Sequence, residues 1–379
     1  MPNLVRPSRP SIRYALGAAF LLLPAAAFAA EPRIVDFRLG LGGEYKLGHW
    51  APVEVVVEGA AGLQVEVVAP DNDGAPAVFP ATAGDTDARQ TIRLLTRVGR
   101  RGTPLVVRLV EGGRPAATAT ATVGGGPGLS LAVGRPSTSR LVAELTPGPS
   151  LLAKAAGLDR RRSTAVASLA DAGALPESWL AYEACDCLWI NFGADDPALK
   201  LSPRQLNAII DWVETGGRLV LAGAEGFAAA TGAVDGLADL LPGRLDGVVT
   251  LRSSAKLEEY AGANQAMPGA RRLELSVARL VEYAGRVEAD AGGRGAQLPL
   301  VVRQRRGFGH VVFVGVDLSR GPLAGWPDAA AFAARAAGIV GPDAEPSADT
   351  GPGRGSGRLL TAGYTDLSGA VQQRLGARF

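Results

Sequence analysis

Residue types that build metal and redox sites are scarce in this chain. Its 379 residues include two cysteines, Cys185 and Cys187, and two histidines, His49 and His310. A zinc cluster needs several such ligands at close spacing, and a disulfide between residues i and i+2 would close a strained ring. We therefore expect no metal and no cofactor, and we interpret the two cysteines as packed thiols of a buried strand.

An excess of positive charge is also absent. The chain has 39 basic and 37 acidic residues, and the first 29 residues hold three of the arginines and no acid. The rest is therefore close to neutral, with 36 basic against 37 acidic residues. That balance excludes the electrostatic footprint of a nucleic-acid-binding protein.

The beginning of the chain has the pattern of a secretory signal. Three arginines precede the apolar run "YALGAAFLLLPAAAFAA", which ends in the small-residue pattern Ala27-Phe28-Ala29. The run is short for a membrane span and contains Pro24. We expect a signal peptide over 1–29 and an exported protein, periplasmic or associated with the cell envelope.

Residues 30–126 have the texture of a β-sandwich. Short β-rich runs such as "APVEVVVEG", "LQVEVVAP" and "TPLVVRLVEGG" alternate apolar and polar residues and are separated by Gly, Pro and Asp. This spacing predicts an Ig-like antiparallel sandwich of roughly seven strands. The segment "GGGPG" then predicts a hinge.

Residues 129–340 alternate strands and helices, which is typical of an α/β domain. "LSLAVG" is the expected first strand, "STAVASL" the second, "CDCLWINFG" the third and "RLVLAG" the fourth. The helix "LSPRQLNAIIDWVETGG" has Ser202 at its N-cap, Pro203 in its first turn and two glycines at its end. It should connect two parallel strands. Later runs up to "GHVVFVGVD" predict antiparallel hairpins at the end of a mixed sheet.

In open α/β sheets ligands bind beyond the carboxyl ends of the strands. The third strand is followed by Asn191, Asp195 and Asp196, the fourth by Ala224 and Glu225, and the last by Asp317, Ser319 and Arg320. We expect these residues to form one ligand crevice if the three strands are neighbours.

The α/β segments resemble a known family. "YEACDCLWINFG", the helix "LSPRQLNAIIDWVETGG", "RLVLAG" and "RRGFGHVVFVGVDLSRGPLAGW" are similar to the class I glutamine amidotransferase-like superfamily. The closest resemblance is to its non-catalytic secreted branch of bacterial envelope proteins, which carry an N-terminal β-sandwich. The resemblance implies a flavodoxin-like α/β fold.

The resemblance also implies a site without its reactive groups. Active members place a cysteine in a G-x-C-x-G turn, and the matching window "AGAEG" has Ala224 at that position. The histidine expected after the last strand is replaced by Asp317 and Leu318, while His310 lies at the other end of that strand, roughly 20 Å away. Amide hydrolysis needs an activated nucleophile and a base. By this resemblance the chain is a pseudoenzyme.

Glu225 and Asp317 could instead be an acid/base pair or hold a cation. The alternative is structural: Glu225 would meet the dipole of the following helix, and Asp317 would accept hydrogen bonds from loop amides. "DNDG" (71–74) resembles the start of a calcium loop, but a turn stabilised by Asx hydrogen bonds fits its sequence better. Trp50 and Trp326 are expected in the core, although an exposed Trp50 would favour carbohydrate binding.

The end of the chain predicts a tether and a short helix. Residues 341–358 are rich in Pro, Gly and Ser, which favours a flexible linker. Residues 359–379 have a weak amphipathic pattern, and a short isolated helix needs a partner to be stable. We expect it to dock on an envelope protein or on the membrane surface.

Three hypotheses for function follow. The first is a non-catalytic exported envelope protein that acts as a binding or scaffolding module. The second is a glycan-directed hydrolase that uses Glu225 and Asp317, which requires both carboxyls to face one cleft. The third is a carbohydrate-binding adhesin that uses exposed aromatic residues of the sandwich.

Overall fold

The structure is a computed structural model that describes residues 31–102, 104–121, 132–146, 149–159, 161–193, 201–269, 272–293 and 297–340. The described residues, which end at Val340, belong to one compact unit. The expected signal peptide, the linker, the C-terminal helix, Asp195 and Asp196 lie outside the described residues.

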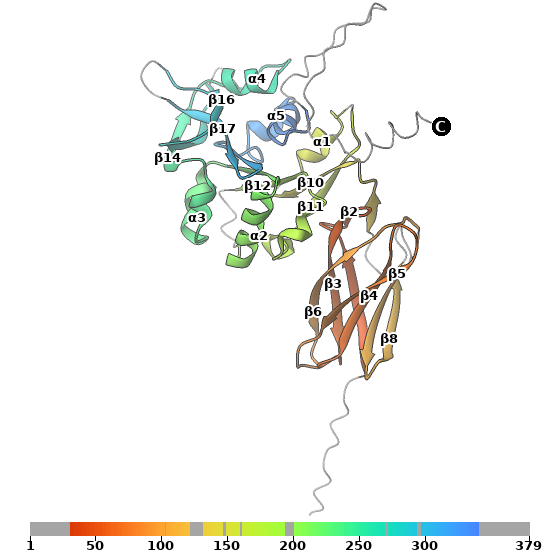
Figure 1. Ribbon diagram of the computed structural model, residues 1–379. Helices are drawn as coiled ribbons and strands as arrows, with labels where there is room; N and C mark the ends of the chain where they lie inside the picture. Colours follow the sequence, from red (N-terminus) through yellow and green to blue (C-terminus); the bar gives the residue numbers. More distant parts are fainter. Residues whose placement is uncertain are drawn as a thin grey trace, which may run out of the picture. The chain divides into compact units, whose positions relative to one another are not determined.

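The first part of the chain folds into two antiparallel sheets (Figure 1). Alternation along the strands explains the core, because Val53, Val55 and Val57 are fully buried while Glu54 points outward. In sheet order the strands are β1 (Arg33–Leu39), β3 (Trp50–Glu58) and β6 (Gln90–Arg97), and then β5 (Pro76–Thr82), β4 (Gln64–Pro70), β7 (Leu105–Glu111) and β8 (Arg114–Ala121).

Strand β5 comes from a segment that the sequence did not identify as a strand. Its residues "PAVFPAT" include Pro76 and Pro80, which cannot donate backbone hydrogen bonds to a neighbour. The strand lies at the edge of its four-stranded sheet, where prolines are tolerated.

The second part is built on a seven-stranded mixed sheet. Five strands are parallel, and the last two join by antiparallel pairing. In sheet order they are β11 (Thr164–Leu169), β10 (Arg140–Leu145), β12 (Cys187–Phe192), β13 (Arg218–Gly223), β18 (Gly309–Val314), β17 (Pro299–Arg306) and β16 (Arg286–Asp290).

The predicted first strand of this sheet is wrong. Of "LSLAVG" (129–134), the structure places the end in β9 (Val133–Arg135), which pairs with β2 (Glu44–Lys46) outside the seven-stranded sheet. The first strand of the sheet is β10, "RLVAEL", in which a buried Glu144 interrupts the apolar run. Glu144 made the apolar pattern of β10 less clear, whereas the apolar run at 129–133 was mistaken for the first strand.

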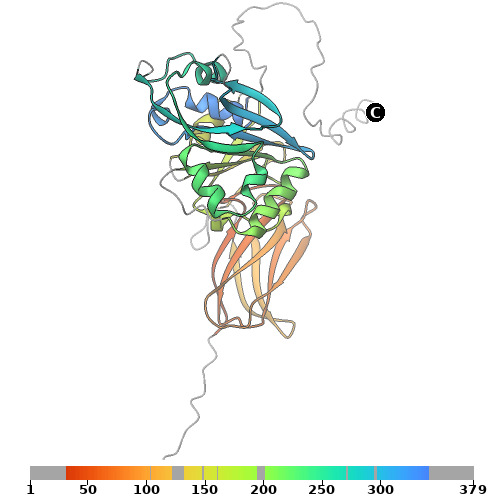
Figure 2. The same cartoon turned by 90° about the vertical axis from the view of Figure 1, so that its left-hand side faces the viewer.

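Helices cover both faces of the sheet (Figures 1 and 2). One face packs against α2 (Pro203–Glu214) and α3 (Glu225–Ala233). The other packs against α1 (Leu152–Ala156), α4 (Ala255–Ala261) and α5 (Ala329–Ala336). Strands β14 (Arg244–Leu251) and β15 (Leu275–Val281) form a separate antiparallel pair. Short 3₁₀ helices complete the unit, namely η1 (Ala172–Ala174), η2 (Trp179–Tyr182), η3 (Leu237–Leu240) and η5 (Leu323–Gly325).

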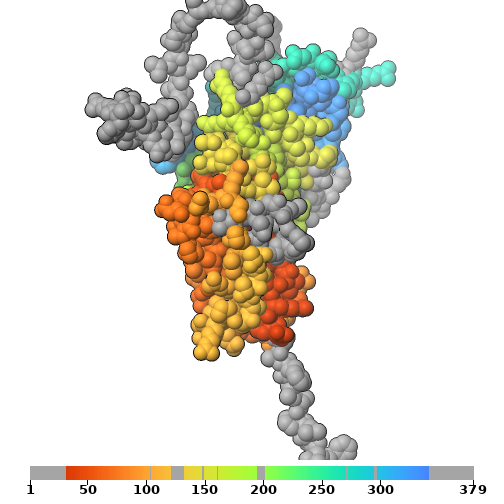
Figure 3. Space-filling model, turned by 90° about the vertical axis from the view of Figure 1, so that its right-hand side faces the viewer, coloured from red at the N-terminus to blue at the C-terminus, as the bar shows by residue number. Residues whose placement is uncertain are grey.

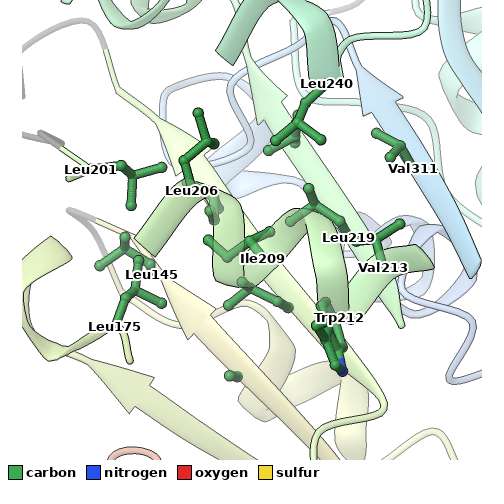
Figure 4. Close-up of a cluster of buried hydrophobic side chains, with 14 of the residues drawn as sticks. Leu145, Leu175, Leu201, Leu206, Ile209, Trp212, Val213, Leu219, Leu240 and Val311 are labelled. Atoms are coloured by element: carbon green, nitrogen blue, oxygen red, sulfur yellow. The ribbon is translucent and has the colours of Figure 1, made fainter. Parts of the chain in front are cut away.

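Helix α2 begins and packs as its sequence predicts. Ser202 accepts a hydrogen bond from the Gln205 backbone, and the Gln205 side chain accepts one from the Ser202 backbone, which completes a capping box. Leu206, Ile209 and Val213 point from α2 toward the sheet (Figure 4). Each buried side chain of this size contributes about 1.5–3 kcal/mol.

Specific contacts join the sandwich to the mixed sheet. Lys46 is buried and pairs with Asp186, whose Oδ2 also accepts a hydrogen bond from the Leu141 backbone at 2.7 Å. The backbone of Trp50 donates to Glu183 at 2.7 Å. In Figure 3 the orange sandwich residues touch the yellow residues that begin the second part.

Parallel pairing brings three strand ends together. β12 pairs with β13, and β13 pairs with β18, so the carboxyl ends of these strands are neighbours at one edge of the sheet. The names Ig-like and flavodoxin-like, and the boundary between residues 126 and 129, stay predictions. No helix within the described ranges is long and apolar enough to span a membrane.

Candidate functional site

Residues that follow two of these three strands line one small cavity, together with residues at the start of β15. The cavity has a volume of about 110 Å³. We call it the carboxylate pocket, and its lining consists of Ala224, Glu225, Glu274, Leu275, Ser276, Asp317, Arg320 and Gly321. The structure therefore places Glu225, Asp317 and Arg320 together, as expected for strand ends that are neighbours.

Asp317 is held in one orientation by three hydrogen bonds to the same oxygen. Its Oδ1 accepts from Asn191 Nδ2 at 3.0 Å, from the Ser319 backbone at 2.9 Å and from Ser319 Oγ at 2.6 Å. The residue is only 6% exposed. The backbone contact is the structural role that the sequence suggested for Asp317.

Asp317 and Asn191 each have one side-chain oxygen without a hydrogen bond from the described residues. Asp317 Oδ2 and Asn191 Oδ1 are buried and accept no hydrogen bond within the described part of the chain. The nearest charge to Asp317 Oδ2 is Arg320 Nε at 3.9 Å, beyond hydrogen-bond length. Buried acceptors without a donor are rare in folded proteins because their desolvation is not repaid.

Glu225 lies at the solvent side of the pocket. Its Oε1 accepts a hydrogen bond from Ser276 Oγ at 2.9 Å, and its Oε2 lies 3.6 Å from Arg320 Nη1. The side chain is about half exposed. Glu225 is also the first residue of α3, where the helix dipole favours its charge.

Arg320 lies between the two carboxylates and contacts both. Its Nη1 lies 3.6 Å from Glu225 Oε2, and its Nε lies 3.9 Å from Asp317 Oδ2. The pocket thus alternates acceptors with donors: Glu225, Asp317 and Glu274 accept, whereas Arg320 donates and Ser276 can do both. Such an arrangement can hold a small polar group by several hydrogen bonds.

Four members of the pocket were not predicted, namely Glu274, Leu275, Ser276 and Gly321. Glu274 directly precedes β15 and Ser276 is the second residue of that strand, which pairs with β14. Their sequence, "RRLELSVARL", indicates only a strand. Nothing in it shows that this strand crosses the carboxyl end of β13.

Ala224 connects β13 to α3 as the N-cap residue, and it is buried. It offers no side-chain cap to the helix. Gly226 explains how closely the turn approaches β12, because a Cβ at this position would lie 2.2 Å from the carbonyl oxygen of Phe192. The turn is therefore shaped by packing against the end of β12.

Residues outside the pocket have structural roles. Cys185 and Cys187 are buried free thiols, and burial raises the pKa of Cys185 to about 12 and that of Cys187 further. The predicted Asx turn is confirmed, because Asp71 Oδ1 accepts from the backbones of Asp73 and Ala75. No group of His, Cys, Asp and Glu within the described residues could hold a metal ion.

The sandwich offers little support for an adhesin surface. Trp50 is half-buried and packs edge-on against Phe79, with 5.8 Å between ring centroids. Trp326 is 3% exposed, as expected for a core aromatic. Among the described residues of the sandwich, no aromatic side chain belongs to the exposed large hydrophobic residues.

Comparisons with known proteins identify no family for this chain. No family model matches it, and no curated protein matches it. Among solved structures, an exo-β-1,4-mannosidase from Opitutaceae bacterium strain TAV5 is similar at 16% identity and a TM-score of 0.33, covering 52% of this chain and 36% of that one. A β-galactosidase from Bacillus circulans sp. alkalophilus is similar at 12% identity and a TM-score of 0.29, covering 48% and 29%.

A β-galactosidase from the Antarctic haloarchaeon Halorubrum lacusprofundi is similar at 15% identity and a TM-score of 0.28, covering 52% of this chain and 30% of that one. This chain thus spans about a third of the length of these glycosidases. Scores this low carry no argument about fold or function.

The predicted membership in the class I glutamine amidotransferase-like superfamily is wrong. Neither a family model nor a curated protein of that superfamily matches the chain. The segments that suggested it are buried strands and an amphipathic helix, which many unrelated parallel α/β sheets share. The interpretation of Ala224 as a lost nucleophile depended on that membership and is withdrawn with it.

Proposed function

We propose that this chain is an exported binding protein whose carboxylate pocket holds a hydroxyl group of a saccharide. Sugar hydroxyls donate and accept hydrogen bonds at once, so they match walls that alternate carboxylates with a guanidinium and a hydroxyl. The observation that carries the proposal is that Arg320 lies between Glu225 and Asp317 in one cavity.

The size of the cavity limits the contact. A volume of about 110 Å³ accommodates a part of one sugar ring, so the rest of the saccharide would lie across the open side near Glu225. Two buried acceptors, Asp317 Oδ2 and Asn191 Oδ1, offer further hydrogen-bonding capacity behind the pocket. We further propose that the protein is located in the cell envelope, with residues 359–379 docked on a partner or a membrane surface.

Titration of the purified chain with a panel of monosaccharides and short oligosaccharides, followed by calorimetry, tests this proposal. Glu225→Gln and Asp317→Asn keep the shape of each side chain and remove its charge, and each should weaken binding at least 10-fold, or about 1.4 kcal/mol. Glu58→Gln is the matched control, because Glu58 pairs with Arg33 in the sandwich. Equal affinity in all three variants would contradict the proposal.

Hydrolysis of a glycosidic bond is the second candidate. It is favoured by one observation, namely that Glu225 and Asp317 reach the same cavity and the same guanidinium. Glycosidases use two carboxyls about 5–10 Å apart, one as acid and the other as nucleophile or base. Release of the aryl group from aryl glycosides, lost in Glu225→Gln, would establish this activity, whereas saccharide binding without turnover would exclude it for the substrates used.

A further inference from the structure

A row of cationic side chains crosses the opposite end of the sheet from the carboxylate pocket. In register, Arg286 of β16 is opposite Arg303 of β17, and Arg305 of β17 is opposite His310 of β18. Side chains two residues apart on a strand share a face, so Arg303 and Arg305 are on the same face. His310 and Asp317 lie at the two ends of β18, so the two sites are separate.

These four side chains line a surface cavity of about 600 Å³. We call it the cation cavity, and its remaining lining residues are Ala284, Gly285, Glu288 and Gln304. Gly285 leaves one wall of the cavity without a side chain. Its φ of 110° favours glycine, and a Cβ there would lie 2.5 Å from the carbonyl oxygen of Arg303. The cavity is therefore wide and bordered mainly by positive charge.

One acid partly balances this charge. Glu288 forms an ion pair with Arg303, whose Nε lies 3.1 Å from Glu288 Oε1 and whose Nη2 donates to Glu288 Oε2 at 3.2 Å. Glu288 Oε2 also accepts a hydrogen bond from the Tyr260 hydroxyl at 3.1 Å. The side chains of Arg286 and Arg305 make no hydrogen bond or ion pair with the described residues. The cavity thus keeps two arginines whose charge is not neutralised, beside an imidazole.

The arrangement is costly without a ligand. Like charges directly opposite on adjacent strands destabilise a sheet, and Arg286 and Arg303 are such a cross-strand pair, while Arg305 is opposite the imidazole of His310. On the other side of β18, His310 is opposite Arg218 of β13. Arg218 Nη1 is buried and has no hydrogen-bond partner within the described residues. Burial, together with Arg218, Arg303 and Arg305, lowers the pKa of His310, as expected where positive potential accumulates.

We propose that the cation cavity binds a phosphate group. Two free guanidinium groups on neighbouring strands can each present a pair of N–H donors, which matches the oxygens of a dianionic phosphate. A bound phosphate neutralises the charge that the sheet leaves unbalanced. The phosphate can belong to a free small molecule or to a lipid headgroup, because Phe308, at the tip of the β17–β18 hairpin, is 88% exposed beside this row.

Calorimetry of the full chain with inorganic phosphate and with glycerol phosphate, at fixed ionic strength set with chloride, tests the site. Both probes should bind more tightly than chloride, and Arg286→Gln and Arg305→Gln should each weaken binding at least 10-fold. Arg114→Gln is the matched control, because Arg114 is an exposed arginine of β8 without a hydrogen bond or ion pair among the described residues. The proposal is overturned if neither probe binds better than chloride, or if Arg114→Gln weakens binding as much.

A second measurement separates the two sources of phosphate. Sedimentation with vesicles that contain phosphatidylglycerol should be reduced by Phe308→Ser only if the ligand is a lipid headgroup. The same variant should bind free glycerol phosphate unchanged, because its side chain does not line the cavity. Binding of both free probes with no vesicle binding assigns the site to a soluble phosphate compound.

Discussion

At the scale of single residues, Lys46 shows how a charge can fix the position of one part of the chain on another. Its side chain is buried, and its partner Asp186 is about one-third exposed. Asp186→Asn keeps an acceptor for the Leu141 backbone but leaves the ammonium group without a counter-charge. We expect a loss of about 3 kcal/mol in the free energy of unfolding, the lower end for a buried pair.

Urea unfolding followed by tryptophan fluorescence measures this loss. The surface pair Arg33 and Glu58 is the comparison, since Glu58→Gln should cost less than about 1 kcal/mol. A loss for Asp186→Asn no larger than for Glu58→Gln would show that Lys46 reaches water in the folded protein.

The two cysteines give a second prediction at this scale. Burial raises the pKa of Cys185 to about 12 and that of Cys187 as well, and only a thiolate reacts readily. A disulfide reagent at pH 8 should therefore modify neither thiol in the folded protein and both in denaturant. Rapid release of chromophore from the native chain would contradict the buried positions.

The residues of the carboxylate pocket differ in how far the sequence could identify them. Glu225 and Asp317 follow runs that are recognisable as strands, so the rule for strand ends was sufficient. Asn191 lies inside β12 and outside the pocket lining, although it donates to Asp317. Ser276 was missed because its place depends on how β14 and β15 return across the end of β13. That path is set by tertiary packing between residues far apart in sequence, which local patterns do not encode.

At the scale of elements, the side-chain amide of Gln205 fixes the start of α2 through both its oxygen and its nitrogen. Its Oε1 completes the capping box with Ser202, and its Nε2 donates to the carbonyls of Ala172 at 2.7 Å and Leu175 at 2.8 Å. Ser202→Ala removes one cap and should cost about 1 kcal/mol. Gln205→Ala removes the side-chain donor from both carbonyls, of which that of Ala172 still accepts from the Leu175 backbone, and should cost about 1–3 kcal/mol.

Thermal or urea unfolding of the two single variants and the double variant measures these costs. Because both residues share the capping box, the double variant should lose less than the sum of the single losses. Strict additivity would show that the two capping hydrogen bonds form independently.

Elements with strong local signals were predicted well, and elements defined by their neighbours were not. Helix α2 has a cap, an N-terminal proline and an apolar face, so its limits could be read from the sequence. Strand β5 contains two prolines and is a strand only because the edge of its sheet accepts them. Strand β9 pairs with β2, a contact between distant segments that no local pattern reveals.

At the scale of the whole molecule, the two histidines should make stability depend on pH. Burial is the main cause that lowers the pKa of His49 and of His310 below the ordinary value of 6.5. For His49 the main opposing group is Glu183, and for His310 it is Glu288, while nearby cations add to the lowering of both. In the window from pH 6.5 down to these lowered values, the unfolded chain therefore binds more protons than the folded one.

Stability should accordingly fall as the pH falls through this window and level off below it, apart from carboxyl titration at lower pH. The slope is at most about 1.4 kcal/mol per pH unit for each histidine. Urea unfolding at a series of pH values from 7.5 to about 5 should show this fall. The His49→Gln/His310→Gln double variant should show a flatter profile, and an unchanged slope would assign the effect to other groups.

The order of strands in the mixed sheet has a consequence for the newly made chain. β13 is completed by β18, and the register pairs Leu219 with Val311, which are separated by about a quarter of the chain. At roughly 5–20 residues per second, a ribosome needs on the order of 5–20 s to extend the chain between these two strands. During that interval β13 carries a bare row of backbone donors and acceptors, so the emerging polypeptide is vulnerable to pairing with the wrong neighbour until its last strand arrives.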